Sequence, residues 1–216
     1  MSARDEVLAR IRSALGDQHG ADVEVSRAYR RDGGDAGADL LGLLDERLTD
    51  YRATVRRASP DGIRDAVAEA VADGLPSRPD TTGSSARLVV PSGLPDAWTS
   101  AVVGDVVTDE DLAVDDLDDC DGVITAAAVA IAETGTIVLD GSPDQGRRAI
   151  TLVPDLHVCV VRADQVVASV PEGVARLDPT RPLTWISGPS ATSDIELNRV
   201  EGVHGPRTLE VVLVSG

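Results

Sequence analysis

The 216-residue chain is long enough for one substantial domain with an extension, and it is short for two domains. Its 37 acidic side chains outnumber the 20 basic ones, all of them Arg, and the formal charge of −17 leaves no basic stripe with which to bind nucleic acid. No apolar run approaches the roughly 20 residues that span a bilayer, and the N-terminus lacks the apolar segment of a secretion signal, so we expect a cytoplasmic protein with no membrane span.

Two amphipathic helices are predicted in residues 1–50, which we assign to an N-terminal helical arm with a flexible linker. The first helix covers residues 2–15, where Ser2 can cap the start, apolar side chains recur at helical spacing and Gly16 can end it. Residues 16–38 are polar, rich in Gly and Asp and without a period, so we expect a flexible connection. The second helix is marked by leucines at helical spacing: Leu40, Leu41, Leu44 and Leu48.

Residues 51–216 are expected to form one α/β domain. Residues 53–58 alternate as a short strand, and Ser59-Pro60 then opens a helix that runs to Gly74. Further strands are predicted from the apolar runs at residues 87–90, 101–107, 123–132, 137–139, 157–161 and 209–214. Strand–helix alternation followed by closely spaced strands predicts a mixed, mainly parallel sheet flanked by helices, with a hairpin insertion.

The acid-rich run from Asp105 to Asp121 lacks the Gly and terminal Glu of a calcium loop, so we interpret it as a solvated helix and loop. Cys120 and Cys159 form no CxxC motif, and two thiols are too few for an iron–sulfur cluster. The excess of acids is typical of a protein adapted to a salty cytoplasm, because salt screens the self-repulsion of a highly charged chain. Under that hypothesis the melting temperature rises from dilute buffer to molar KCl; an ordinary acidic protein is the alternative.

Three segments are candidates for a functional site, and the first is the turn Glu133-Thr134-Gly135-Thr136 after a long apolar run. A Glu at the end of a buried strand lies at the rim of the sheet, where α/β proteins often bind ligands. Gly135 is expected to supply a positive φ angle. From the residues alone, Glu133 can equally be an ordinary turn acid.

The second segment is the loop GSPDQGRR at residues 141–148, which carries the paired cations Arg147 and Arg148. One of the two guanidinium groups can fork onto a carboxylate or phosphate. The alternative is that both arginines offset nearby acids.

The third segment is SGPSATSDIE at residues 187–196. Ser193 and Glu196 have the spacing of a capping box, which predicts a helix start whose free N–H groups can hold an anion. Asp194 and Glu196 would repel a phosphate placed there.

The same segment is followed by GVHGP, in which His204 lies between glycines and can titrate near neutral pH as a base or a substrate ligand. No catalytic triad, zinc-ligand spacing, phosphate-binding loop or dinucleotide fingerprint appears in the sequence.

Four motifs in this order resemble the lactate-utilisation protein C family, whose members carry a LUD domain. They are AETGT, then TLVP before the apolar strand with His157, then SGPSATSDIE, then GVHGPRTLEVVLV. The likeness covers roughly residues 51–216. The near absence of aromatic residues departs from the family pattern and affects packing more than the motif chemistry.

The resemblance implies a fold similar to the sugar-phosphate isomerase and CoA-transferase group, and a role in oxidising L-lactate to pyruvate beside iron–sulfur partner proteins. No cofactor is then expected in this chain, because the clusters belong to the partners. Glu133 is the candidate nucleophile by analogy with CoA transferases, and His204 is the second catalytic candidate. The motif residues map onto Glu133, Thr134, Gly135, Thr136, Ser187, Gly188, Ser190, Thr192, Asp194, Glu196, Gly202, His204, Gly205 and Pro206.

Two further functions stay open at this point. A stand-alone enzyme of the CoA-transferase or sugar-phosphate isomerase type would act through Glu133. A binding protein for a small anion, such as a small carboxylic acid, would use Arg147 or Arg148 together with the helix start at Ser193.

Overall fold

The computed structural model describes residues 2–16, 26–29, 39–75, 85–192, 200–201 and 205–216. By its internal contacts the chain divides into two compact units, residues 1–30 and residues 31–216. Each unit is described by itself.

The N-terminal unit contains helix α1 (Ala3–Leu15), as predicted. The Ser2 hydroxyl accepts the Asp5 N–H at 3.3 Å, the Asp5 carboxylate accepts the Ser2 N–H at 3.0 Å, and Gly16 follows the last turn with a positive φ angle. The apolar side chains of α1, such as Ile11, are about half exposed. Sequence signals at both ends therefore locate this helix.

The larger unit is built on a six-stranded parallel sheet in the order β1-β12-β7-β4-β2-β3. Almost every position of the two central strands β7 and β12 is buried, which fits their nearly continuous apolar sequence. The strands are β1 (Thr54–Ala58), β2 (Arg87–Val90), β3 (Asp105–Thr108), β4 (Gly122–Ala126), β7 (Leu156–Arg162) and β12 (Thr208–Val214). This sheet with its flanking helices confirms the predicted α/β class.

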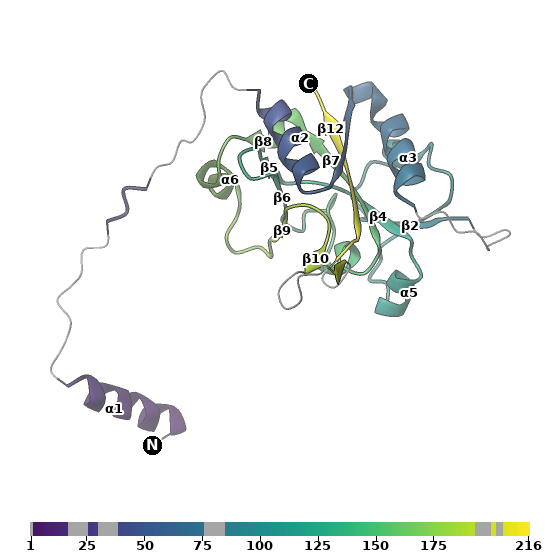
Figure 1. Ribbon diagram of the computed structural model, residues 1–216. Coiled ribbons are helices and arrows are strands. Elements are labelled where there is room, and N and C mark those ends of the chain that lie inside the picture. Colours follow the sequence, from purple (N-terminus) through teal and green to yellow (C-terminus); the bar gives the residue numbers. More distant parts are fainter. Residues whose placement is uncertain (1, 17–25, 30–38, 76–84, 193–199, 202–204) are drawn as a thin grey trace. The chain divides into compact units, whose positions relative to one another are not determined.

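Helices α2 (Leu40–Asp50) and α3 (Ile63–Gly74) cover opposite faces of the sheet, as Figure 1 shows. α3 follows a 3₁₀ turn, η1 (Pro60–Gly62), and packs Val67 and its neighbours on one face. α2 buries Leu44 and Leu48 completely against the other face. The second helix, which the sequence grouped with the N-terminal arm, thus packs into the core of the larger unit.

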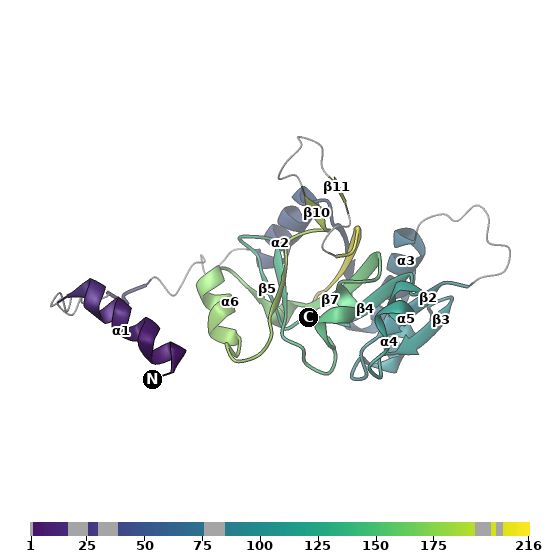
Figure 2. The same ribbon diagram turned by 90° about the horizontal axis from the view of Figure 1, so that it is seen from below.

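A second sheet of four strands in the order β8-β5-β6-β9 packs on the face that α2 covers. Its centre is the antiparallel hairpin of β5 and β6, which corresponds to the predicted insertion. Figure 2 shows β5 and helix α6 on one side of β7, with β2, β3 and the short helices α4 and α5 on the other. The strands are β5 (Val129–Ile131), β6 (Thr136–Leu139), β8 (Val166–Val167) and β9 (Thr184–Ile186).

The single strand predicted for residues 123–132 is wrong, because this run forms β4 and β5 in two different sheets. The Ala126 N–H donates to the Asp144 carbonyl and the Ala128 N–H to the Val138 carbonyl, so the chain leaves one sheet for the other at Ala127. Consecutive alanines conceal this break, since they carry no turn signal. The strand predicted within residues 101–107 is β3, which begins at Asp105.

Short elements complete the described chain. They are α4 (Asp96–Thr99), α5 (Val114–Asp118), α6 (Val170–Arg176), the 3₁₀ turns η2 (Arg148–Thr151) and η3 (Ala163–Gln165), and the two-residue strands β10 (Ala191–Thr192) and β11 (Val200–Glu201). β10 and β11 pair antiparallel. Helix α5 and the turns around it fit the solvated helix and loop predicted between Asp105 and Asp121. The first four residues of that segment form β3 instead.

Candidate functional site

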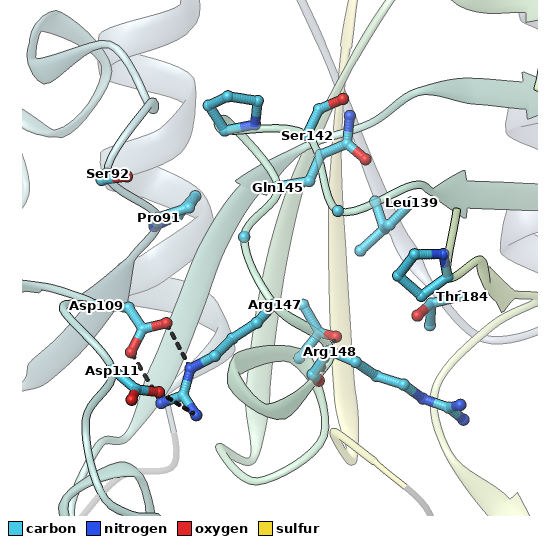
Figure 3. Close-up of a pocket in the computed structure, with 15 residues that line it drawn as sticks. Pro91, Ser92, Asp109, Asp111, Leu139, Ser142, Gln145, Arg147, Arg148 and Thr184 are labelled. Carbon is cyan, nitrogen blue, oxygen red and sulfur yellow. Dashed lines mark hydrogen bonds and ion pairs between the residues drawn. The ribbon is translucent and has the colours of Figure 1, made fainter. Parts of the chain in front are cut away.

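The larger of two neighbouring cavities lies at the carboxyl ends of β2 and β3, and we call it the switch-point cavity. It has a volume of about 550 Å³ and is lined by Pro91 and Ser92 directly after β2, by Asp109 directly after β3, and by the loop that carries Arg147 and Arg148 (Figure 3). The direction of the strand order reverses between β2 and β4: the strand after β2 is β3, on one side, whereas the next strand of this sheet after β4 is β7, on the other side. Such a reversal is where open α/β sheets usually bind ligands.

Arg147 forms an internal ion pair across this cavity. Its Nε and Nη2 atoms donate to the two carboxylate oxygens of Asp109 at 2.8 and 2.9 Å, and Nη2 also donates to the Leu112 carbonyl at 2.5 Å. The Asp109 side chain is only 6% exposed. The bidentate hydrogen bonds from Arg147 lower the pKa of the Asp109 carboxyl group despite this burial. The guanidinium group of Arg147 is therefore already paired with a carboxylate of the same chain.

Arg148 has a different environment although it is the next residue. It begins the 3₁₀ turn η2, its side chain is exposed, and it forms no ion pair with any residue that the structure describes. Figure 3 shows the guanidinium group extending away from Asp109 and Arg147. The sequence left open which arginine is available to a ligand, and the geometry leaves Arg148.

A second cavity, which we call the histidine cavity, adjoins the first and shares Arg148, Thr151 and Thr184 with it. Its volume is about 300 Å³, and His157 at the start of β7 lines it with only 1% of the residue exposed. The described lining includes no acidic residue, and Arg148 is its only charged side chain.

His157 begins a buried chain of polar groups that runs into the sheet. Its Nε2 lies 2.8 Å from the Thr125 hydroxyl, which lies 3.8 Å from Cys159 Sγ, which in turn lies 3.8 Å from the Ala126 carbonyl oxygen. Burial lowers the pKa of His157 to about 4 and raises the pKa of the Cys159 thiol to about 12. Both groups are therefore neutral at physiological pH.

The direction of this chain follows from its last member. When both 3.8 Å sulfur contacts are taken as hydrogen bonds, the Cys159 thiol donates to the carbonyl oxygen, the Thr125 hydroxyl donates to sulfur, and the Nε2–H group of His157 donates to the hydroxyl oxygen. In this arrangement the second ring nitrogen of His157, Nδ1, carries a lone pair and can accept a hydrogen bond.

The structure brings parts of the predicted motifs together. The Thr136 hydroxyl lies 2.8 Å from both the Thr134 and the Ser187 hydroxyls, and the Ser190 N–H donates to the Pro206 carbonyl at 2.8 Å. Gly188, Ser190 and Gly205 line the histidine cavity together with Ser187. The described ends of the third and fourth family motifs therefore meet beside this cavity, and the first motif contacts the third through Thr136 and Ser187.

Two motif glycines lie against the end of α2. Gly135 has φ +60°, and a Cβ atom there would lie 2.8 Å from Arg47 Cβ; Gly188 has φ +87°, and a Cβ atom there would lie 2.7 Å from Tyr51 Cβ. Both positions need glycine for its backbone angle and for the close approach of the helix. The positive φ angle predicted for Gly135 is confirmed.

The other predicted site residues fall elsewhere. Glu133 is exposed, donates its N–H to the Ala168 carbonyl, and lines neither of the two cavities. Thr192 lies in β10. Asp194, Glu196, Gly202, His204 and the predicted helix start at Ser193 lie outside the described residues.

Sequence reasoning missed the part of the cavity that β7 and β9 provide. The sequence places His157 only within a family motif, and it carries no signal for Thr184 or Trp185. A single His inside the buried strand LHVCVVR, which is otherwise apolar up to its last residue, is the one signal that points to it, because a buried polar group needs a partner.

The described part of the chain contains no cluster of three or more His, Cys, Asp or Glu side chains placed to hold a metal ion. Within the same residues, no helix is both long and apolar enough to cross a membrane.

Comparison with known proteins places this architecture in a family. The LUD domain family model matches residues 97–214. Lactate utilization protein C of Deinococcus radiodurans is 48% identical over 183 residues, which cover 82% of this chain and 81% of that protein. Lactate utilization protein C of Geobacillus thermodenitrificans is 28% identical over 82% of this chain and 79% of its own length, and that of Bacillus subtilis is 34% identical over 43% of this chain and 41% of its own length.

A solved structure agrees with these sequence relatives. The crystal structure of a DUF162 family protein from Deinococcus radiodurans superposes with a TM-score of 0.64 at 41% identity, covering 81% of this chain and 96% of that one. The chain therefore belongs to the lactate-utilisation protein C family of LUD-domain proteins.

Proposed function

We propose that this chain is a cytoplasmic component of an L-lactate utilisation system, in which lactate is oxidised to pyruvate together with iron–sulfur partner proteins. The observation that carries the proposal is the 48% identity, over most of both chains, to a protein named for lactate utilisation. A shared role in lactate utilisation follows from that relationship, and the iron–sulfur partners are our extension of it.

The cysteines of the chain support this division of labour. A cluster needs about four thiolates, whereas the chain has two cysteines and both are buried. Burial raises the pKa of both thiols, that of Cys159 to about 12, so neither is an available thiolate. In this proposal the partners carry the electrons, and this chain contributes binding or assembly.

Gene deletion in the source organism tests the role in lactate utilisation. We expect the deletion strain to lose growth on L-lactate as the sole carbon source and to keep normal growth on pyruvate, the product of the oxidation. Restoring the full chain should restore growth. Undiminished growth of the deletion strain on L-lactate would contradict the proposal.

Affinity purification tests the partnership. The full chain, tagged at its own locus and purified from cells grown on L-lactate, should carry iron, acid-labile sulfide and proteins with cysteine-rich cluster motifs. The matched control is the same purification from cells grown on pyruvate. A chain that emerges from lactate-grown cells alone and free of iron would contradict the partnership.

A second function, group transfer on CoA esters or sugar phosphates through Glu133, finds no support in the geometry. Glu133 is exposed and lies outside both the switch-point cavity and the histidine cavity. If Glu133→Gln leaves growth on L-lactate unchanged, the Glu133 carboxylate has no essential part in lactate utilisation.

A further inference from the structure

We infer that the histidine cavity binds a small 2-hydroxy monocarboxylate, with Arg148 holding the carboxylate and His157 Nδ1 accepting the hydrogen bond of the hydroxyl group. The choice of ligand class rests on the proposed function, whereas the site itself rests on charge, valence, hydrogen-bond direction and size.

The charge of the lining selects an anion. The chain has 37 acidic residues in 216, yet none of the described residues that line the histidine cavity is acidic, and Arg148 is their only charged side chain. A cavity of this kind in a chain with a formal charge of −17 attracts small anions that the rest of the surface repels.

The number of cations selects a single carboxylate. One guanidinium group matches one carboxylate through two parallel N–H···O bonds. Arg147 adds no second charge, because its fork holds Asp109 at 2.8 and 2.9 Å in the neighbouring cavity. Polyphosphate and phosphosugar ligands would need further cations that this lining does not offer.

The buried chain behind His157 selects a hydroxyl group on the ligand. With Nε2–H donating to Thr125, Nδ1 is an acceptor, and it stays unprotonated at neutral pH because burial holds the pKa of the imidazole at about 4. An acceptor of this kind satisfies a ligand O–H group and offers no donor to a bare carboxylate. His157 is therefore a group for recognition.

The size of the cavity selects a small ligand. A volume of about 300 Å³ is at the lower end of the range of about 300–1,000 Å³ for small-molecule sites. Three shared residues connect it to the switch-point cavity, so a short hydroxy acid bound at Arg148 faces an adjoining space of about 550 Å³.

Calorimetric titration of the full chain with L-lactate tests the inference. Propionate, which lacks the hydroxyl group, and L-lactamide, which lacks the negative charge, are the comparison ligands. L-Lactate should bind, propionate should bind roughly 3- to 10-fold more weakly for the loss of one neutral hydrogen bond, and L-lactamide should give no measurable binding. Failure of L-lactate to bind, or equal affinity for L-lactate and propionate, would overturn the inference.

Arg148→Gln identifies the carboxylate ligand. We expect L-lactate affinity to fall at least about 10-fold, the loss of a charge-assisted pair. The matched control is Arg64→Gln, which removes the same charge from α3, where Arg64 pairs with its neighbour Asp65 at 2.8 Å. If the two variants bind L-lactate equally, Arg148 is not the ligand.

His157→Gln identifies the hydroxyl acceptor and should remove the preference for L-lactate over propionate while leaving propionate affinity unchanged. Because this variant alters a buried residue, a second pair keeps the test decisive. Thr125→Val removes the acceptor that orients the imidazole and should also remove the preference, whereas Thr125→Ser should retain it. Preference that persists in Thr125→Val would contradict the assigned orientation of His157.

Failure of this inference and failure of the proposed function give different results. If the deletion strain cannot grow on L-lactate but the purified chain does not bind it, the function stands and the site assignment falls. If the chain binds L-lactate through Arg148 but the deletion strain grows normally on it, the site stands and the function falls.

Discussion

Arg147 and Arg148 are adjacent in the chain, but their electrostatic surroundings differ: Arg147 lines only the switch-point cavity, whereas Arg148 lines both cavities. In the switch-point cavity, Arg147 is neutralised by Asp109, whose side chain is 6% exposed, and Asp111 lies 3.5 Å away as a further counter-charge. In the histidine cavity, Arg148 has no acidic neighbour among the described lining residues. In a chain this acidic, an arginine that has no acidic neighbour among the described lining residues is a better candidate for binding an anion than an arginine that is already paired with a carboxylate.

The two cavities also differ in how they are built. The switch-point cavity is formed largely by loops that follow β2 and β3. The histidine cavity is formed by segments of the family motifs, tied to one another by the Thr136–Ser187 contact and held against α2 through Gly135 and Gly188. The motif residues thus line or support the smaller cavity, and the glycines among them allow the backbone angles and close contacts found there.

The largest expected difference between the cavities is in stability when each arginine is removed. Arg147→Met should lower the free energy of unfolding by about 2–3 kcal/mol, because it leaves the buried Asp109 carboxylate without its bidentate partner. Arg148→Met, the matched control, should change it by less than about 0.5 kcal/mol, as for an exposed residue that forms no ion pair with a described residue. Urea denaturation at neutral pH measures both; equal losses would mean that the two arginines do not differ as described.

The buried imidazole gives the histidine cavity a pH dependence of its own. A folded pKa of about 4 lies below the unfolded value of about 6.5, so the unfolded chain takes up the proton first as the pH falls, and the folded state loses stability from about pH 6.5 downward. Between pH 7.5 and pH 5.0 this amounts to about 2 kcal/mol.

His157→Gln should abolish that part of the pH dependence. The measurement is the free energy of unfolding of both proteins at the two pH values, in which all other titrating groups cancel in the difference. Parallel pH curves for the two proteins would show that the imidazole is not buried in its neutral form.

Replacing one glycine in the lining of each cavity compares how tightly the backbone is packed there. Gly188→Ala should lower the free energy of unfolding by about 1–2 kcal/mol more than Gly141→Ala. Both residues have positive φ, +87° and +70°, but a Cβ atom at Gly188 would lie 2.7 Å from Tyr51 Cβ, whereas the nearest atom at Gly141 is 3.7 Å away. Denaturation of both variants isolates the contact with α2, and equal destabilisation would show that the helix can move aside.

The sequence predicted the elements whose signals are local. α1 begins and ends where Ser2 and Gly16 indicated, and β2 covers the predicted residues 87–90. What it could not predict depends on tertiary contacts. The passage from β4 to β5 is concealed in a run of alanines, and the sequence assigns α2 to an arm because nothing in its leucines tells which surface buries them.

The same limit applies to the site. The pair Arg147-Arg148 was identified, but only the position of Asp109, 38 residues away, decides which arginine is occupied. His157 was read as part of a motif because its partner Thr125 is 32 residues distant in the chain. Motif residues on undescribed segments, such as His204, remain predictions from the sequence.

The smallest expected effect is also the one that most sharply separates recognition from acid–base chemistry in the histidine cavity. A guanidinium group is a permanent cation, and His157, with a pKa of about 4, stays neutral above pH 5. L-Lactate affinity should therefore change by less than about 2-fold between pH 8 and pH 5.5. Calorimetry at several pH values measures it, with Arg64→Gln as a control for the titration of distant groups. A rise in affinity through pH 6.5 would mean that a protonated imidazole binds the carboxylate, and His157 would then be a charge partner of the ligand, with its neutral hydrogen-bond acceptor role excluded.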